Sequence, residues 1–265
     1  MPKKVILPQK NPDLLDIVQI TDCHIFPTQQ GRFGGVDTAA TLSRVIDHIN
    51  TAESPDMVLV TGDLVNDPEA PAYERLLALL KRLKTRVYCL PGNHDLPALM
   101  HRLINTANVA TDNVLEGRHW RVVLLDTMLP GTHSGALSGN ELAFLEETLR
   151  AAGDQFILVA MHHHPVAVDS PWMDTMMLDN PVEFFTVIDR YPAVKGITWG
   201  HVHQLFSRMH NAVHLLGTPS TCRQFRLEGE IAGMDGKPPA YRRIRLHRDG
   251  RLSSEVQWLA DNREN

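Results

Sequence analysis

The chain has 265 residues, of which 43% are hydrophobic and 22% are charged, and its formal net charge at pH 7 is −5. This length allows a substantial core in one large domain or two small ones, and the composition is typical of a soluble globular protein. The negative charge argues against nucleic acid as the main partner, and no apolar run approaches the roughly 18 residues of a membrane-spanning helix. Arginines 242, 243, 245 and 248 could form a local basic patch, but a solvated strand face is the preferred interpretation.

The cysteines and the N-terminus both favour a cytoplasmic protein that is not attached to a membrane. Cys23, Cys89 and Cys222 are odd in number and far apart, which suits a reducing compartment better than a disulfide framework. The first eight residues begin with basic side chains but lack the apolar segment of a signal peptide. We expect a monomer or a homodimer, with Cys23 and Cys89 packed inside the protein.

The first 161 residues predict strands that alternate with helices. Aliphatic and β-branched runs that stop at polar or glycine-containing turns predict strands at 16–21, 57–61, 86–90, 120–125 and 155–161. Apolar residues with helical spacing lie between them, first at Leu42, Val45, Ile46 and Ile49, and then from Tyr73 to Leu83. Such alternation predicts parallel strands joined by right-handed crossovers.

Two further helices are predicted from their first residues. Ser138 is expected to cap one of them, with Glu141 reaching back to Ser138 as in a capping box. Asn180 and Pro181 are expected to begin the other, which runs toward Tyr191.

The C-terminal part, residues 196–260, is predicted to be rich in β-structure. Short strands are expected at 197–199, 204–209, 213–216, 241–246 and 252–258. Because no helices separate them, we expect an antiparallel second sheet or sheet half. Residues 228–239 are expected to form a flexible loop. No linker divides the chain, so residues 1–265 are expected to form a single domain.

Five polar clusters follow the ends of predicted strands. They are Asp22-Cys23-His24, Gly62-Asp63, Gly92-Asn93-His94-Asp95, His162-His163-His164 and Gly200-His201-Val202-His203. Open α/β sheets bind ligands at the carboxyl ends of their strands, so we expect one shared site. Carboxylate, imidazole and amide donors suit Mn²⁺, Fe²⁺ or Zn²⁺ better than Ca²⁺. Two such ions roughly 3.5–4 Å apart would favour phosphoryl transfer.

Each cluster taken alone also has a purely structural explanation. Gly62-Asp63 is typical of a turn, and Asp63 could cap a helix that begins at Leu64. Asp95 could cap the helix that is expected near Pro97. The ordered set of five clusters is what favours a metal site.

In this order the clusters resemble the calcineurin-like metallophosphoesterase superfamily, over residues 16 to about 203. The chain is most similar to its class III cyclic-nucleotide branch, the bacterial 3′,5′-cyclic AMP phosphodiesterases, at residues 19–24, 162–165 and 218–225. The resemblance implies an α/β fold, a four-layer α/β/β/α sandwich of mixed sheets with a binuclear site at the carboxyl ends of strands. It also implies hydrolysis of 3′,5′-cyclic AMP to 5′-AMP by a metal-bridging hydroxide.

The resemblance also implies roles for individual residues. The implied metal ligands are Asp22, His24, Asp63 and His203 for one ion, and Asn93, His162 and His201 for the other, with Asp63 bridging both. The expected cofactors are two divalent ions, Fe²⁺ or Mn²⁺ with Zn²⁺ as an option. His94 and Asp63 are the implied catalytic residues, and His94 would help to protonate the leaving 3′-oxygen. The implied substrate-binding residues are His24, Asp63, Asn93, His94 and His203.

Three points stay open. Many relatives have an aspartate that orients the catalytic histidine, where this chain has Asn66 beside Asp67; Asn66 would stabilise an imidazolium less than a carboxylate would. His162 is the preferred ligand of the triple histidine, with His163 and His164 expected beside the ligands or facing the substrate. Trp172, Met173, Met176 and Met177 could line a nucleotide pocket or form a mobile loop that packs on the core.

Rival activities are a broad-specificity phosphodiesterase or a glycerophosphodiesterase of the same superfamily. A metal-free, non-catalytic scaffold is the competitor from another class of protein. A protein serine/threonine phosphatase is disfavoured, because the residues that follow Asp63 differ from the Asp-Arg-Gly pattern of those enzymes.

Overall fold

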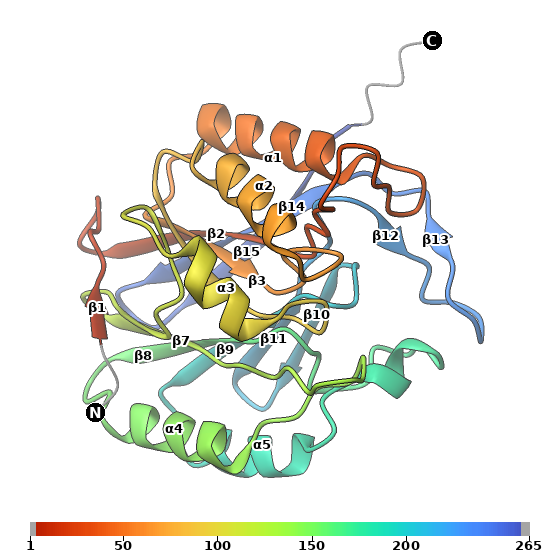
Figure 1. The fold of residues 1–265 in the computed structure, drawn as a ribbon. Coiled ribbons are helices and arrows are strands. Elements are labelled where there is room, and N and C mark those ends of the chain that lie inside the picture. Colours follow the sequence, from red (N-terminus) through yellow and green to blue (C-terminus); the bar gives the residue numbers. More distant parts are fainter. Residues whose placement is uncertain (1–3, 261–265) are drawn as a thin grey trace.

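The structure is a computed structural model that describes residues 4–260, so residues 1–3 of the N-terminal stretch considered above and residues 261–265 lie outside it. Its elements form four layers, with helices on the outside and two β-sheets on the inside (Figure 1). The upper helices in this view are α1 (Thr38–Ala52), α2 (Ala70–Leu80) and α3 (Pro97–Ile104), and the lower ones are α4 (Gly139–Arg150) and α5 (Pro181–Ile188). The predicted α/β/β/α sandwich is confirmed.

The upper sheet has six strands in the order β15-β14-β2-β3-β4-β5. Their bounds are Leu14–Ile20 (β2), Met57–Thr61 (β3), Arg86–Leu90 (β4), Val109–Ala110 (β5), Ala240–His247 (β14) and Leu252–Trp258 (β15). Strands β2 to β5 pair in parallel, as the alternation of strands and helices predicts, and β14 pairs antiparallel with both β2 and β15.

The lower sheet has seven strands in the order β1-β6-β7-β8-β9-β11-β10. Their bounds are Lys4–Ile6 (β1), Val114–Glu116 (β6), Trp120–Leu124 (β7), Phe156–Ala160 (β8), Val194–Trp199 (β9), Phe206–His210 (β10) and Val213–Gly217 (β11). Strands β7, β8, β9 and β11 run parallel. Two short strands, β12 (Gln224–Phe225) and β13 (Met234–Asp235), pair outside both sheets, and Met173–Met176 form the 3₁₀ helix η1.

The two sheets face each other across a buried apolar layer. In β3, Val58 and Val60 pack in the cluster with helices α1 to α3, whereas Met57 and Leu59 pack in the cluster between the sheets. This alternation follows from the two-residue period of a strand, and it lets each sheet bury both of its faces. A third cluster joins the lower sheet to α4 and α5. The single-domain prediction stays a prediction.

The predicted antiparallel C-terminal sheet is wrong in two respects. The late strands divide between the two sheets, because β9 to β11 join the lower sheet while β14 and β15 join the upper one. In addition, β9 pairs in parallel with β8, because α5 supplies the crossover connection that parallel pairing needs. The loop expected at 228–239 contains β13, and β10 begins at Phe206, later than predicted.

Two smaller expectations about helices are also corrected. Ser138 caps α4 by accepting a hydrogen bond from the Glu141 amide, but the Glu141 carboxylate accepts from the Asp126 amide and does not reach back. Asn180 precedes α5, yet its side chain bonds to the main chain of Leu137, and the helix ends at Ile188, before Tyr191. In both cases a contact distant in sequence replaces the local one.

The arginines at 242, 243, 245 and 248 do not form a basic patch, and the solvated-face interpretation holds only in part, since Arg248 is exposed whereas Arg242 is buried. Arg242 is buried, with 2% of its surface exposed, and donates to the Gly217 carbonyl and the Thr218 hydroxyl. Arg243 points to the other face and pairs with Asp16 and Glu53. Successive side chains of a strand face opposite sides, so this run of arginines is split in two. Within residues 4–260, no helix is long and apolar enough to cross a membrane.

Candidate metal centre

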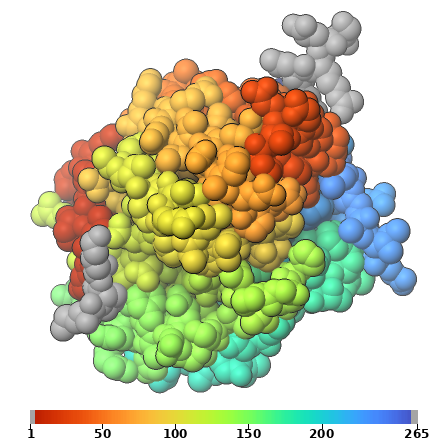
Figure 2. Space-filling view, in the orientation of Figure 1, coloured from red at the N-terminus to blue at the C-terminus, as the bar shows by residue number. Residues whose placement is uncertain are grey.

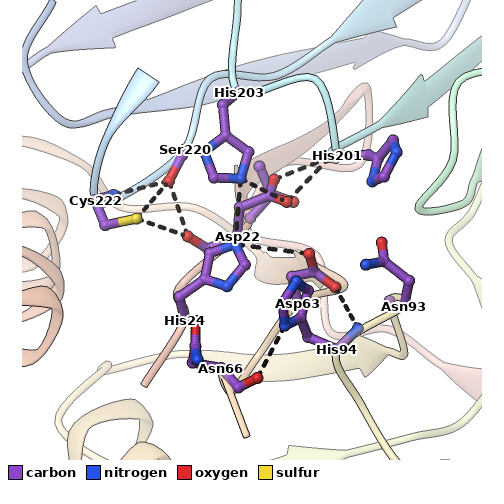
Figure 3. Close-up of polar contacts among 12 residues, drawn as sticks. Asp22, His24, Asp63, Asn66, Asn93, His94, His201, His203, Ser220 and Cys222 are labelled. Atoms are coloured by element: carbon purple, nitrogen blue, oxygen red, sulfur yellow. Dashed lines mark hydrogen bonds and ion pairs between the residues drawn. The ribbon is translucent and has the colours of Figure 1, made fainter. Parts of the chain in front are cut away.

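The five polar clusters converge at one edge of the sandwich, where strands from both sheets end. Asp22 and His24 follow β2, Asp63 follows β3, Asn93 and His94 follow β4, His162 follows β8, and His201 and His203 follow β9. Figure 3 shows side chains from these turns pointing toward a common centre. The upper sheet therefore supplies the carboxylates, and the lower sheet supplies three of the imidazoles.

Left-handed backbone directs many of these side chains into the centre. The backbone φ angle is 53° at Asp22, 47° at Asp63 and 65° at His201, and it is also positive at His24 and His203. Non-glycine residues seldom adopt this region, and such strain persists only where the surrounding structure enforces it. Its concentration at five residues of the polar clusters marks this edge as a functional site.

Two glycines allow the strand ends to approach closely. A Cβ at Gly200 would lie 2.0 Å from the Thr21 hydroxyl and 2.7 Å from Asp22 Oδ2. A Cβ at Gly62, where φ is +90°, would lie 2.3 Å from His162 Nδ1. Both positions require glycine, because any side chain would force the sheets apart at the site.

One group of donors surrounds the Asp22 carboxylate. His203 Nε2 lies 3.2 Å from Asp22 Oδ1 and 3.2 Å from His24 Nε2, and His24 Nε2 lies 3.6 Å from Asp63 Oδ2. Figure 3 shows these four side chains facing one another. Asp22, His24 and His203 lie close enough together to hold a metal ion.

A second group lies on the other side of Asp63. His162 Nε2 is 3.3 Å from Asp63 Oδ1 and 3.2 Å from Asn93 Oδ1. The rings of His162 and His201 are 5.0 Å apart. The two oxygens of Asp63 thus face different imidazoles, Oδ2 toward His24 and Oδ1 toward His162, which is the arrangement that a bridging carboxylate needs.

The donor set fits divalent ions. Both ring nitrogens of His201 and Nδ1 of His24 are buried and have no hydrogen-bond partner within the described part of the chain. Buried polar atoms are normally hydrogen-bonded, so such groups in a native structure require an explanation. The facing imidazole nitrogens of His24 and His203, 3.2 Å apart and next to buried carboxylates, would be stabilised by cations bound between them. Nitrogen and carboxylate oxygen donors suit Mn²⁺, Fe²⁺ or Zn²⁺.

The remaining histidines of the triple cluster lie behind the metal-binding candidates. His163 and His164 are fully buried and do not line the cavity, so they do not face a substrate. The Thr127 hydroxyl lies 2.7 Å from His163 Nδ1, and His164 Nε2 lies 3.5 Å from Asp174. His163 also groups with His162 and His201 at metal-ligand distances.

Main-chain carbonyls orient two of the metal-binding candidates, a feature that sequence reasoning missed. His162 Nδ1 lies 2.8 Å from the Thr61 carbonyl, and His203 Nδ1 lies 2.6 Å from the Arg223 carbonyl. These contacts leave each Nε2 directed at the centre, as in many metal sites. The Ser220 hydroxyl donates to the Asp22 carbonyl, so the 218–225 segment braces the site from behind (Figure 3).

Burial and neighbouring charges shift the pKa values in the centre. Although burial alone would lower it, the Asp63 carboxylate raises the pKa of His162 to about 9. Burial would raise the pKa of Asp63, but His162 and His24 hold it well below its usual range. Burial lowers the pKa of His24 to about 3 and the pKa of His201 well below 6.5. Neutral His24 and His201 beside an ionised Asp63 are the protonation states that bind metal, whereas the raised pKa of His162 means that a metal ion would have to displace its proton.

His94 is oriented by the main chain, which corrects the expectation about Asn66. His94 Nδ1 lies 2.8 Å from the Asn66 carbonyl oxygen, so neither the Asn66 amide nor Asp67 is the acceptor. The backbone amide of His94 donates to Asp63 Oδ1 at 3.0 Å. His94 is therefore tied both to the bridging candidate and to the turn that follows it.

Neither Asp63 nor Asp95 is a helix cap. No helix begins at Leu64 within residues 4–260, and α3 begins at Pro97 without a side-chain cap. Asp95 instead accepts hydrogen bonds from the Leu64 amide, the Gly92 amide and the Tyr73 hydroxyl. Burial raises the pKa of Asp95 to about 7, and the nearby Asp63 adds to the effect. Asp95 and Tyr73 fix the turns that carry Asp63 and His94.

A cavity of about 460 Å³ opens above this centre, within the range of roughly 300–1,000 Å³ that is typical of small-molecule pockets. Its floor contains His24, Asp63, Asn93, His94, His201 and His203, and its outer wall contains Phe33, Trp172, Met173, Met176 and Phe225.

Cys23, Cys89 and Cys222 are buried as free thiols.

Comparison with known proteins matches residues 15–205 to the family described as calcineurin-like phosphoesterase. A Pseudomonas aeruginosa protein named 3′,5′-cyclic adenosine monophosphate phosphodiesterase CpdA is 36% identical over 247 residues, which cover 92% of this chain and 90% of that protein. A Nostoc sp. protein named 3′,5′-cyclic-nucleotide phosphodiesterase is 34% identical over 244 residues, which cover 92% of each. A dimetal phosphatase from Danio rerio shares the fold, with 14% identity, a TM-score of 0.65, and coverage of 94% of this chain and all of that one.

Proposed function

The chain belongs to the calcineurin-like phosphoesterase family, and we propose that it is a phosphodiesterase that hydrolyses 3′,5′-cyclic AMP to 5′-AMP. Similarity to proteins named for this activity over nine-tenths of the chain supports the substrate. The observation that carries the reaction class is Asp63, whose two carboxylate oxygens face separate groups of imidazoles at the floor of the cavity. A cytoplasmic location and a monomeric or homodimeric state stay predictions.

Seven side chains would hold two divalent ions. Asp22, His24, Asp63 and His203 would bind one, and Asp63, Asn93, His162 and His201 the other. When bound, such ions activate water as a nucleophile and neutralise charge on the phosphoryl oxygens. Fe²⁺ and Mn²⁺ are the proposed ions, with Zn²⁺ as a further option.

His94 is the residue that we assign to the leaving group. Its Nδ1 must carry the hydrogen in the contact with the Asn66 carbonyl, because a carbonyl oxygen only accepts. The ring is thereby oriented so that a protonated Nε2 can donate to the leaving 3′-oxygen, within a cavity that His94 lines. Asn93 and His94 extend from one turn, so they can bind and protonate the same phosphodiester.

A turnover panel combined with metal analysis tests the proposal. Purified protein should contain close to two transition-metal ions per chain and should hydrolyse 3′,5′-cyclic AMP. The panel also includes cyclic GMP, 2′,3′-cyclic AMP, glycerophosphodiesters and bis-p-nitrophenyl phosphate. Preference for a glycerophosphodiester, or equal rates on all diesters, would replace cyclic AMP as the assigned substrate. Far fewer than two ions without turnover would indicate a non-catalytic scaffold.

Asp63→Ala tests the bridging role, with Asp67→Ala as a matched control on the same turn. Asp67 is exposed, and its side chain has no place in the proposed centre. We expect Asp63→Ala to abolish activity and to lower metal content, and Asp67→Ala to leave both near wild type. Wild-type rates in Asp63→Ala would remove Asp63 from the mechanism.

A further inference from the structure

The cavity has an aromatic wall next to its metal-binding floor. We use this term for Phe33, Trp172 and Phe225, which all line the cavity and are all half-buried. The wall is continuous with the floor, because Phe33 stacks on His24 with ring centroids 4.4 Å apart, and Phe225 stacks on His203 at 4.1 Å. A molecule held at the floor therefore contacts the wall as soon as it extends outward.

The three rings come from distant parts of the chain but lie together. Trp172 meets Phe225 edge to face, with centroids 5.3 Å apart, and Phe33 lies 6.1 Å from Phe225. Figure 2 shows the segments around residues 30 (red-orange), 172 (green-teal) and 230 (blue) gathering on the same side of the molecule. Half-exposed aromatic rings around a concavity are typical of a small-molecule site.

The segment that carries Trp172 is held in place by hydrogen bonds. Trp172 Nε1 donates to the Arg226 carbonyl at 3.2 Å, and the Ser170 hydroxyl donates to the Leu227 carbonyl at 2.7 Å. The Asp174 carboxylate accepts from the amides of Val168 and Ser170. These bonds favour a preorganised pocket wall over the mobile-loop interpretation of this segment.

We infer that the aromatic wall is a stacking subsite for the nucleobase of the substrate, an inference that rests on the proposed function. With the phosphodiester held between Asp63 and His94, the sugar and base must leave the floor through the same cavity, which the wall borders. A flat ring system is the chemistry that these side chains recognise. Stacking accepts any base, because every base has a π-face, so the wall confers affinity for nucleotides and not a choice between adenine and guanine.

Two substitutions at Trp172 separate stacking from simple packing. Trp172→Phe keeps an aromatic ring, whereas Trp172→Leu keeps apolar volume and removes the ring. Trp258→Leu is the matched control, since Trp258 is also partly exposed but lies on β15 and outside the cavity. With the Mn²⁺-loaded proteins, we measure how strongly three compounds inhibit cyclic AMP hydrolysis. The compounds are 5′-AMP, which has a base and a sugar, ribose 5-phosphate, which has only the sugar, and inorganic phosphate, which has neither.

We expect Trp172→Leu to weaken 5′-AMP by about 5- to 20-fold, within the range for loss of one base–aromatic contact. Inhibition by ribose 5-phosphate and by inorganic phosphate should change less than about 2-fold, as expected of a substitution that removes none of their contacts. Trp172→Phe should retain most of the 5′-AMP affinity, and Trp258→Leu should retain all of it.

Unchanged 5′-AMP inhibition in Trp172→Leu would overturn the inference, and so would a parallel loss for all three inhibitors, which would place the damage at the metal centre. Equal weakening in Trp172→Phe and Trp172→Leu would also count against stacking. The proposed function fails separately, through absence of cyclic AMP turnover in the wild-type protein. The three compounds are then compared by their dissociation constants, measured by titration calorimetry, which needs no turnover.

Discussion

Replacing Asn66 by alanine is expected to leave catalysis almost unchanged, although the family resemblance implies an orienting carboxylate at this position. The acceptor for His94 Nδ1 is the main-chain carbonyl of Asn66, at 2.8 Å, and alanine retains that carbonyl. A hydrogen bond to a charged group is worth about 1.5–3 kcal/mol, so loss of a side-chain acceptor would lower kcat by about 10- to 150-fold. Because the acceptor is retained, we expect kcat to stay within about 2-fold of wild type, as for a substitution that removes no named interaction.

The assay is steady-state hydrolysis of cyclic AMP by Mn²⁺-loaded protein, with thermal unfolding as a check on the fold. His94→Asn provides the scale, since removal of a general acid costs about 10²- to 10⁴-fold in rate. Asn66→Asp should also stay near wild type. A loss of 10-fold or more in Asn66→Ala, at an unchanged Tm, would show that the side chain and not the backbone orients His94.

Three further predictions concern the glycine contacts, a buried carboxyl group and the ions. Gly200→Ala should lower both metal content and Tm, because the new Cβ would overlap the Thr21 side chain. The control Gly139→Ala has open space at its Cβ and should change Tm little. Equal changes of Tm in the two variants would contradict this prediction. Burial raises the pKa of Glu141, so the native state binds more protons than the unfolded state and loses stability as the pH rises above 4.5. Glu141→Gln cannot ionise and should gain Tm relative to wild type as the pH rises, and a pH-independent difference would refute this account. Removal of bound metal by a chelator should lower Tm, and added Mn²⁺ should restore it. Added Ca²⁺ should not restore it, because the buried donors include imidazole nitrogens, which Ca²⁺ disfavours. An unchanged Tm after chelation would argue against bound ions.

The strand ends and the donor residues could be predicted because both leave local signals. Strand β3 is a run of aliphatic residues that stops at Gly62, and the polar residue that follows such a strand must lie at the sheet edge. The order of the five clusters then sufficed to place Asp22, Asp63 and His201 near one another. The four layers followed from the family resemblance, since periodicity alone did not assign the C-terminal strands.

Other features had no local signal. The carbonyls of Thr61, Asn66 and Arg223 orient three histidines, yet every residue has a carbonyl, so side-chain patterns cannot identify the ones that are used. The pairing of β9 depends on partners distant in sequence. The charge of Arg242 predicts exposure to solvent. The side chain is nevertheless buried, because the carbonyls of Gly217 and Phe206 accept hydrogen bonds from its guanidinium, and these acceptors are distant in sequence.

The division of the metal-binding candidates between two sheets has a mechanical consequence. Asp22, Asp63 and Asn93 extend from the upper sheet, and His162, His201 and His203 extend from the lower one. Each ion, when bound, would therefore link the two sheets. Sliding of one sheet over the other would then require metal–ligand bonds to break. Amide hydrogens at the ends of β3 and β8 should accordingly exchange with deuterated solvent more slowly in the metal-loaded protein than after chelation.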